Sequence, residues 1–134
     1  SNMPRKDHPF SCGELQTTAF YGYGTYEVRM KAAPANSGMV SAFFTYTGQP
    51  HGEIHDEIDF EFIGSRKNSV DASFHSKGNG GSIVPVDLPF DPRTDFNDFA
   101  FHWTPERLTW YANGRVLREV NRSDVEKYPT TPGK

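Results

Sequence analysis

The sequence predicts an all-β protein, an antiparallel β-sandwich, on three observations. Several segments alternate apolar and polar residues at a period of two, as half-buried strands do. Glycine and proline, at 12 and 10 of the 134 residues, are frequent enough to supply many turns. We find no segment of useful length with the 3.6-residue period of a helix, and no internal repeat. The length suits one domain and is too short for two.

The strands follow one another along the whole chain. In order, we predict them at 14–20, 25–31, 39–47, 56–62, 70–76, 83–88, 98–103, 108–112 and 115–120. Segment 25–31 alternates most cleanly, and Pro85 restricts strand 83–88 to a sheet edge or a bulge. Asn113-Gly114 is the strongest hairpin signal. The glycine-rich residues 77–82 are expected to be flexible.

Bulk properties exclude several partners. The formal net charge of −3 gives neither the basic footprint of a nucleic-acid-binding protein nor a polybasic membrane patch. The longest apolar run is far shorter than a membrane span. We therefore expect no nucleic acid and no membrane as partner. Residues 1–11 are polar and without period, so we predict a flexible arm there and one domain over 12–134. Cys12 is the only cysteine, which excludes a disulfide within this sequence.

The segment 56–62 carries the strongest chemical signal. At period two it places Glu57, Asp59 and Glu61 on one face and Ile58, Phe60 and Phe62 on the other. Three carboxylates on one face repel each other, and acidic residues are depleted in strands, so local stability does not explain them. The plain alternative is a solvated sheet face.

Most glycosidases use two carboxyl groups, which flank the scissile glycosidic bond. Glu57 and Glu61 lie four residues apart, so roughly 13 Å separates their Cα atoms on a straight strand. Long glutamate side chains that lean over Asp59 can close most of that distance, so the spacing is compatible with a retaining mechanism but does not establish it against an inverting one, whose carboxylates lie further apart.

The run Glu57-Ile58-Asp59-Phe60-Glu61 resembles the signature of glycoside hydrolase family sixteen, particularly its bacterial endo-β-1,3-1,4-glucanases of the lichenase type. The resemblance extends over residues 12–134 and includes the segments 22–28, 41–48 and 103–114. It implies a bent jelly roll of the concanavalin type with a concave substrate face. It also implies an endo-acting β-glucan hydrolase that cleaves β-1,3-1,4- or β-1,3-glucosidic bonds with retention.

The resemblance assigns a role to each carboxylate. Glu57 is the nucleophile, Asp59 the assisting carboxylate and Glu61 the general acid/base. Physical chemistry supports this division, because the charges of Glu57 and Asp59 disfavour ionisation of Glu61 and let it hold a proton near neutral pH. Attack by Glu57 removes one negative charge, after which Glu61 is the better base and activates water.

Six further positions match places where related glucanases contact sugar: Glu14, Phe44, Tyr46, His55, Ser73 and His75. His55 stands where a tryptophan is common, and Ser73 and His75 stand where asparagine and tyrosine are common. Gln16 also replaces a frequent arginine. Loss of an indole platform weakens stacking on a pyranose ring, so the subsites are expected to accept a different glucan. Core packing is the alternative for Phe44 and Tyr46, and it is favoured for Trp103 and Trp110.

No cofactor is required by this reading, and a structural calcium ion is compatible with it. His51, Glu53 and His55 imitate a metal-binding spacing, but that spacing gives a shared face only on a helix. Pro50 and Gly52 disfavour a helix there, so we predict no metal site.

A polysaccharide substrate favours a secreted or periplasmic protein, although the sequence shows no signal peptide. Related enzymes carry more strands before Cys12 and after residues 128–134. A sandwich that lacks these terminal strands exposes its edges, which favours a homo-oligomer. Two alternatives to hydrolysis stay open: a non-catalytic glucan-binding module or inactive fragment, and a transglycosylase on the same site.

Overall fold

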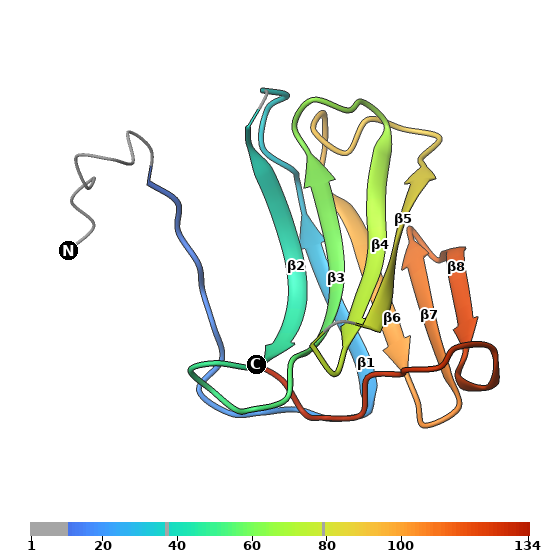
Figure 1. The fold of residues 1–134 in the computed structure, drawn as a ribbon. Helices are drawn as coiled ribbons and strands as arrows, with labels where there is room; N and C mark the ends of the chain where they lie inside the picture. Colours follow the sequence, from blue (N-terminus) through green and yellow to red (C-terminus); the bar gives the residue numbers. More distant parts are fainter. Residues whose placement is uncertain (1–10, 37, 79) are drawn as a thin grey trace.

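The computed structural model describes residues 11–36, 38–78 and 80–134, and these residues form a two-layered β-sandwich (Figure 1). The strands are β1 (Gly24–Met30), β2 (Val40–Thr47), β3 (Asp56–Ile63), β4 (Ser69–Ser76), β5 (Gly80–Asp87), β6 (Asn97–Trp103), β7 (Arg107–Ala112) and β8 (Arg115–Asn121). A short 3₁₀ turn, η1 (Arg122–Asp124), follows β8. Among the described residues, no helix is long and apolar enough to cross a membrane.

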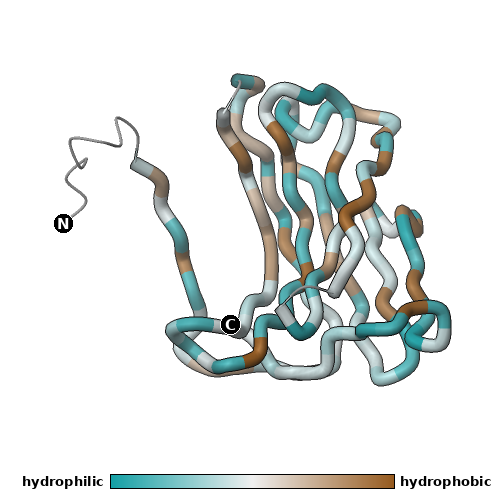
Figure 2. Tube along the Cα trace, viewed as in Figure 1, coloured by the Kyte–Doolittle hydropathy of each residue, from teal (hydrophilic) through white to brown (hydrophobic). Residues whose placement is uncertain are grey.

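Two antiparallel sheets make up the layers. One has the strand order β2-β3-β4-β5 and the other the order β1-β6-β7-β8. The core lies between them, where Phe60 and Phe62 from β3 pack edge-on against Phe99 of β6 at ring-centroid distances of 5.5 and 4.9 Å. Apolar residues recur along the strands, while the turns at their ends are mostly hydrophilic (Figure 2). The predicted antiparallel sandwich is confirmed.

Local turn chemistry explains how neighbouring strands connect. Asn113 and Gly114 both have positive φ, at 46° and 76°, which is the backbone of a type I′ hairpin between β7 and β8. Pro85 lies in β5, which is an edge strand, so its missing N–H costs no bond to a second neighbour. The predicted hairpin at Asn113-Gly114 and the predicted edge position of Pro85 are both confirmed.

Two predicted elements differ from the structure. The predicted strand 14–20 is wrong, because this segment is solvent-exposed along its length and forms no strand with either sheet. The second difference is that β5 begins at Gly80, three residues earlier than predicted, since Gly80 and Gly81 pair with Ser76 and His75 of β4. The predicted arm at 1–11 lies almost wholly outside the described residues.

One side of the sandwich is open, between β1 and β2, which are edge strands of the two sheets. A cavity of about 530 Å³ lies there, lined by residues of 15–17, 21–27 and 42–45 and by Lys134. At its lower end Lys134 exchanges two backbone hydrogen bonds with Tyr46 of β2, at 2.9 and 3.0 Å. Ala42 and Phe44, which line this cavity, also lie opposite Glu61 and Asp59 of β3.

Asp56, the first residue of β3, connects that strand to the C-terminal tail. Its buried carboxylate accepts hydrogen bonds from the backbone N–H groups of Lys77 at 2.9 Å, Thr130 at 2.8 Å and Thr131 at 3.0 Å. Burial by itself would raise the pKa of Asp56, but these N–H donors outweigh it and hold the pKa below its ordinary value.

We predict that Asp56→Asn destabilises the fold by about 3 kcal/mol at neutral pH, because an amide cannot satisfy all three donors. Since the native pKa of Asp56 is depressed, this stability is present above the unfolded-state pKa of 3.8 and is lost as pH falls through the lower, native pKa. Urea unfolding at neutral pH and at about pH 3 would measure both effects. The exposed Asp95→Asn is the matched control, and equal losses in the two variants would contradict the prediction.

Candidate active site

The carboxylates lie on β3, which pairs with β2 on one side and β4 on the other. Ile58, Phe60 and Phe62 are at most 1% exposed and point into the core. The alternation of a strand then turns Glu57, Asp59 and Glu61 to the outer face of the sheet. Asp59 is buried even there, at 3% exposed, whereas Glu57 and Glu61 are half-buried.

The second sheet fixes the backbone of this strand from below. Trp110 of β7 is fully buried, and its indole N–H donates to the backbone carbonyl of Asp59 at 3.0 Å. Trp103 is equally buried and donates to the carbonyl of Pro129 at 3.0 Å. Both tryptophans are therefore core residues, as predicted, and Trp110 also holds the middle of the carboxylate strand in place.

The register of the sheet gives each carboxylate two cross-strand neighbours. Glu57 lies opposite Tyr46 of β2 and His75 of β4. Asp59 lies opposite Phe44 and Ser73. Glu61 lies opposite Ala42 and Asp71. Phe44 and Tyr46 thus share the outer face with the carboxylates rather than pointing into the core.

His55 contacts the first carboxylate from the loop before β3. Its Nε2 lies 2.7 Å from Oε2 of Glu57, a hydrogen-bonding distance. Its ring stacks on that of His75 at a centroid distance of 5.5 Å and an interplanar angle of 13°. The ring of Tyr46 lies beside that of His55 at a centroid distance of 5.3 Å. The rings of Tyr46, His55 and His75 therefore lie next to Glu57 and restrict the conformations of its side chain.

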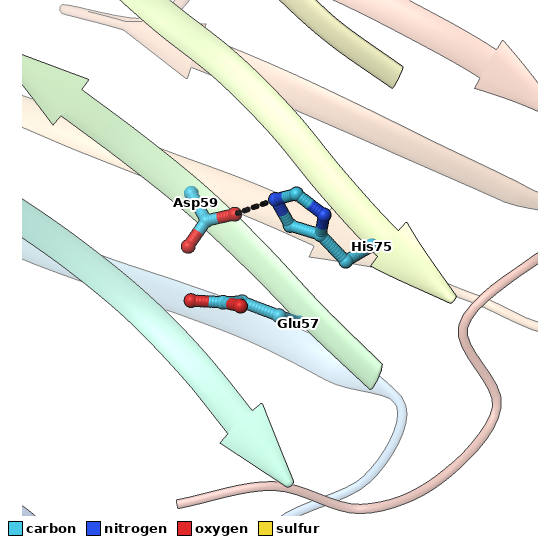
Figure 3. A group of neighbouring side chains, drawn as sticks. All are labelled: Glu57, Asp59 and His75. Carbon is cyan, nitrogen blue, oxygen red and sulfur yellow. Dashed lines mark ion pairs between the residues drawn. The ribbon is translucent and has the colours of Figure 1, made fainter. Parts of the chain in front are cut away.

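Asp59 occupies the centre of the group, and its Oδ2 is buried without a hydrogen-bond partner among the described residues. Nε2 of His75 lies 4.0 Å from this oxygen (Figure 3). Burial, together with the neighbouring charges of Glu57 and Glu61, raises the pKa of Asp59 to about 9. Asp59 therefore carries a proton at neutral pH.

Glu61 also has a raised pKa, first through burial and then through the charges of Asp71 and Glu57. His75 and Arg66 act in the opposite direction. Asp71 is buried and forms an ion pair with Arg66 at 2.5 Å. Sequence reasoning missed Asp71 and Arg66. A signal for Asp71 was present, because Asp71, Ser73 and His75 alternate along β4 in the same way as the carboxylates along β3.

The structure brings five of the six predicted sugar-contacting residues to the carboxylate face: Phe44, Tyr46, His55, Ser73 and His75. Glu14 lies elsewhere, in the exposed segment before β1, where it accepts a hydrogen bond from Gln16. Ser73 is fully buried, and its Oγ has no hydrogen-bond partner in the described part of the chain.

The side chains able to hold a metal ion differ from the trio weighed in the sequence. Glu57, Asp59 and His75 each offer a ligand atom, and these atoms lie within 4.8 Å of one another. Glu53, in contrast, is exposed in the loop before β3.

Comparison with known proteins shows a family and several relatives to which this chain is similar. The profile of glycosyl hydrolases family 16 matches residues 2–134. A beta-glucanase of Paenibacillus polymyxa is 44% identical over 128 residues, which are 96% of this chain and 52% of the relative. The endo-1,3-1,4-beta-glycanase ExoK of Rhizobium meliloti is 43% identical over 129 residues, 96% of this chain and 47% of the relative.

Solved structures agree with the sequence relatives. The Bacillus licheniformis beta-glucanase superposes with a TM-score of 0.75 at 40% identity, over 87% of this chain and 52% of that one. The Crh5 transglycosylase gives a TM-score of 0.69 at 30% identity, over 85% of this chain and 46% of that one. The chain spans about half the length of the curated relatives it matches.

We predict that Glu57→Gln lowers the pKa of Asp59 below about 9, because a neutral neighbour no longer repels the ionised carboxylate. The pKa stays above its ordinary value of 3.8, since burial persists. A carboxyl ¹³C NMR titration would measure the shift. Glu53→Gln, an exposed change in the loop before β3, is the control. An unchanged or higher pKa of Asp59 in the Glu57 variant would contradict this account.

Proposed function

This chain belongs to glycosyl hydrolase family 16, and we propose that it carries the catalytic carboxylates of an endo-acting, retaining β-glucan hydrolase. The observation that supports the proposal best is the outer face of β3, where a protonated Asp59 lies between Glu57 and Glu61. Neighbouring carboxyl groups that differ in protonation state can divide the roles of acid, base and nucleophile between them. A sheet surface that only binds sugar has no need of them.

The proposed reaction has two displacements. In the first, a carboxylate oxygen of Glu57 attacks the anomeric carbon while the bond to the leaving oxygen breaks. Glu61, whose pKa is raised, donates its proton to that oxygen. In the second, Glu61 takes a proton from water, and the resulting hydroxide oxygen attacks the anomeric carbon and releases Glu57. Two inversions retain the configuration of the sugar.

Asp59 and His55 act on the nucleophile in this proposal. Asp59 keeps its proton at neutral pH and holds it next to the Glu57 carboxylate, which it orients. His55 contacts Oε2 of Glu57 from the other side at 2.7 Å. Two partners fix the long side chain in an attacking position, which lowers the entropic part of the barrier. No cofactor takes part.

Relatives support a β-glucan as substrate, since the matching proteins include beta-glucanases and an endo-1,3-1,4-beta-glycanase. The binding surface of this chain is distinctive, however. His55 and His75 present imidazole rings on the face where the sugar would lie. We propose that these groups favour hydrogen bonding to hydroxyls over stacking on a sugar ring. We also propose a secreted or periplasmic location, where such a polymer is met.

Transglycosylation is the second candidate, because the Crh5 transglycosylase shares the fold at 30% identity. Its first displacement would be the same. A sugar hydroxyl instead of water would then attack the glycosyl ester of Glu57. Addition of an oligosaccharide acceptor separates the two functions, since a transglycosylase forms longer products and a hydrolase does not.

We predict that the chain releases reducing sugar from barley mixed-linkage β-glucan faster than from laminarin. In Glu57→Gln the rate should fall by at least about a thousandfold, because the amide cannot form the glycosyl ester. A reducing-sugar assay measures both. Glu53→Gln serves as the control for a lost carboxylate outside the site. Equal rates for the wild type and Glu57→Gln would overturn the assignment of the nucleophile.

Loss of the acid/base group should show a different signature. We predict that Glu61→Ala loses activity on β-glucan but is rescued by sodium azide when the substrate has an activated aryl leaving group. Such a leaving group needs no proton, and azide replaces the water that Glu61 would have activated. The expected product is a β-glycosyl azide, identified by NMR. Absence of rescue, with the variant folded, would count against this role for Glu61.

A further inference from the structure

The carboxylate face contains an imidazole that the proposed hydrolysis does not require. His75 of β4 lies opposite Glu57, and together with Glu57 and Asp59 it forms a mixed set of nitrogen and oxygen ligands within 4.8 Å of one another. We propose that Glu57, Asp59 and His75 form a binding site for a divalent transition-metal ion, Zn²⁺ in particular, that blocks the catalytic centre when occupied.

The distance between Asp59 and His75 is the first argument. Oδ2 of Asp59 and Nε2 of His75 are 4.0 Å apart and directed at one another (Figure 3). This exceeds a hydrogen bond, which spans about 2.7 to 3.2 Å. Two zinc ligands at about 2.1 Å from the ion lie about 3.4 Å apart at a tetrahedral angle and about 4.2 Å apart when opposite. The observed 4.0 Å lies between these two values, so a tetrahedral ion requires the two side chains to approach each other by about 0.6 Å.

Glu57 supplies the third ligand from the same strand as Asp59. Its carboxylate is half-buried, and one of its oxygens lies within 4.8 Å of the ligand atoms of Asp59 and His75. His55 already contacts Oε2 of Glu57 at 2.7 Å, and a bond from Oε1 to the ion would leave that contact intact. Carboxylates that bind metals are commonly oriented by an outer hydrogen-bond partner of this kind.

The second argument is the unsatisfied hydrogen-bonding capacity of the buried Asp59 carboxyl group. Asp59 is more than nine-tenths buried, yet its Oδ2 has no hydrogen-bond partner within the described residues. A buried polar oxygen without a partner is unfavourable by about 1–3 kcal/mol. A metal ion at this position would satisfy that oxygen and the facing nitrogen together, replacing any proton that they carry.

Ligand type determines which ion the site selects. One imidazole nitrogen and two carboxylates match the donors of many zinc sites, whereas Mg²⁺ and Ca²⁺ prefer oxygen ligands alone. An ion bonded to Glu57 would also occupy the lone pair that attacks the anomeric carbon. The inhibitory consequence therefore rests on the proposed function, while binding of the ion does not.

The test is titration of the chain with ZnCl₂ by isothermal calorimetry in metal-free buffer at neutral pH. All proteins carry Cys12→Ser, because the exposed thiol of Cys12 is itself a zinc ligand. We expect one strong site per chain, with MgCl₂ giving no saturable heat. His75→Tyr should weaken zinc binding by at least about tenfold, and His55→Phe should weaken it by a similar or smaller factor.

His102→Tyr is the matched control, since His102 is an exposed histidine on β6 of the other sheet. It should bind zinc as tightly as the Cys12→Ser parent. Thermal unfolding with and without ZnCl₂ verifies that each variant is folded, and the zinc-induced rise in Tm should be smaller in His75→Tyr than in the parent and unchanged in His102→Tyr. No saturable zinc binding, or equal affinity in the parent and His75→Tyr, would overturn the site. Saturable binding without inhibition of glucan hydrolysis would overturn its blocking role.

Discussion

The central position of β3 in its sheet is the constraint on which the site depends. Backbone pairing with β2 and β4 leaves the strand no freedom to rotate, so its alternate side chains must face either the core or the outer surface. A slip of one residue would place Glu57, Asp59 and Glu61 among the phenylalanines of the core. The indole of Trp110, which donates to the carbonyl of Asp59 from the opposite sheet, opposes such a slip at its midpoint. The apolar face thus determines where the carboxylates stand.

Much of this arrangement could be predicted from the sequence because it depends on local periodicity. The two faces of segment 56–62, the edge position of Pro85 and the turn at Asn113-Gly114 all follow from neighbours along the chain. Segment 14–20 shows where such reasoning fails. A strand exists only if another strand pairs with it, and periodicity says nothing about pairing.

The residues that make up the site also could not all be predicted from periodicity along the chain. The carboxylates were recognisable in one stretch of sequence, whereas Asp71 becomes part of the site only through its register with Glu61 across β3 and β4. Arg66 joins through its ion pair with Asp71, from a turn whose sequence looks like ordinary polar surface. Glu14 matched a family position but lies away from the carboxylates. Cross-strand register brought in Asp71 and a turn contact brought in Arg66, and neither follows from the periodicity of one strand.

The protonated state of Asp59 links this chemistry to the folding equilibrium. In the unfolded chain an aspartate is ionised above its ordinary pKa of 3.8, but in the fold this one holds its proton up to about pH 9. Folding near neutral pH therefore takes up one proton from solvent, and Asp59 alone changes the formal net charge from −3 to −2. Because the native state binds the extra proton, the contribution of Asp59 to the stability of the fold falls as pH rises from 3.8 to about 9. In alkaline solution, loss of the Asp59 proton would thus destabilise the fold and at the same time place a second negative charge beside Glu57.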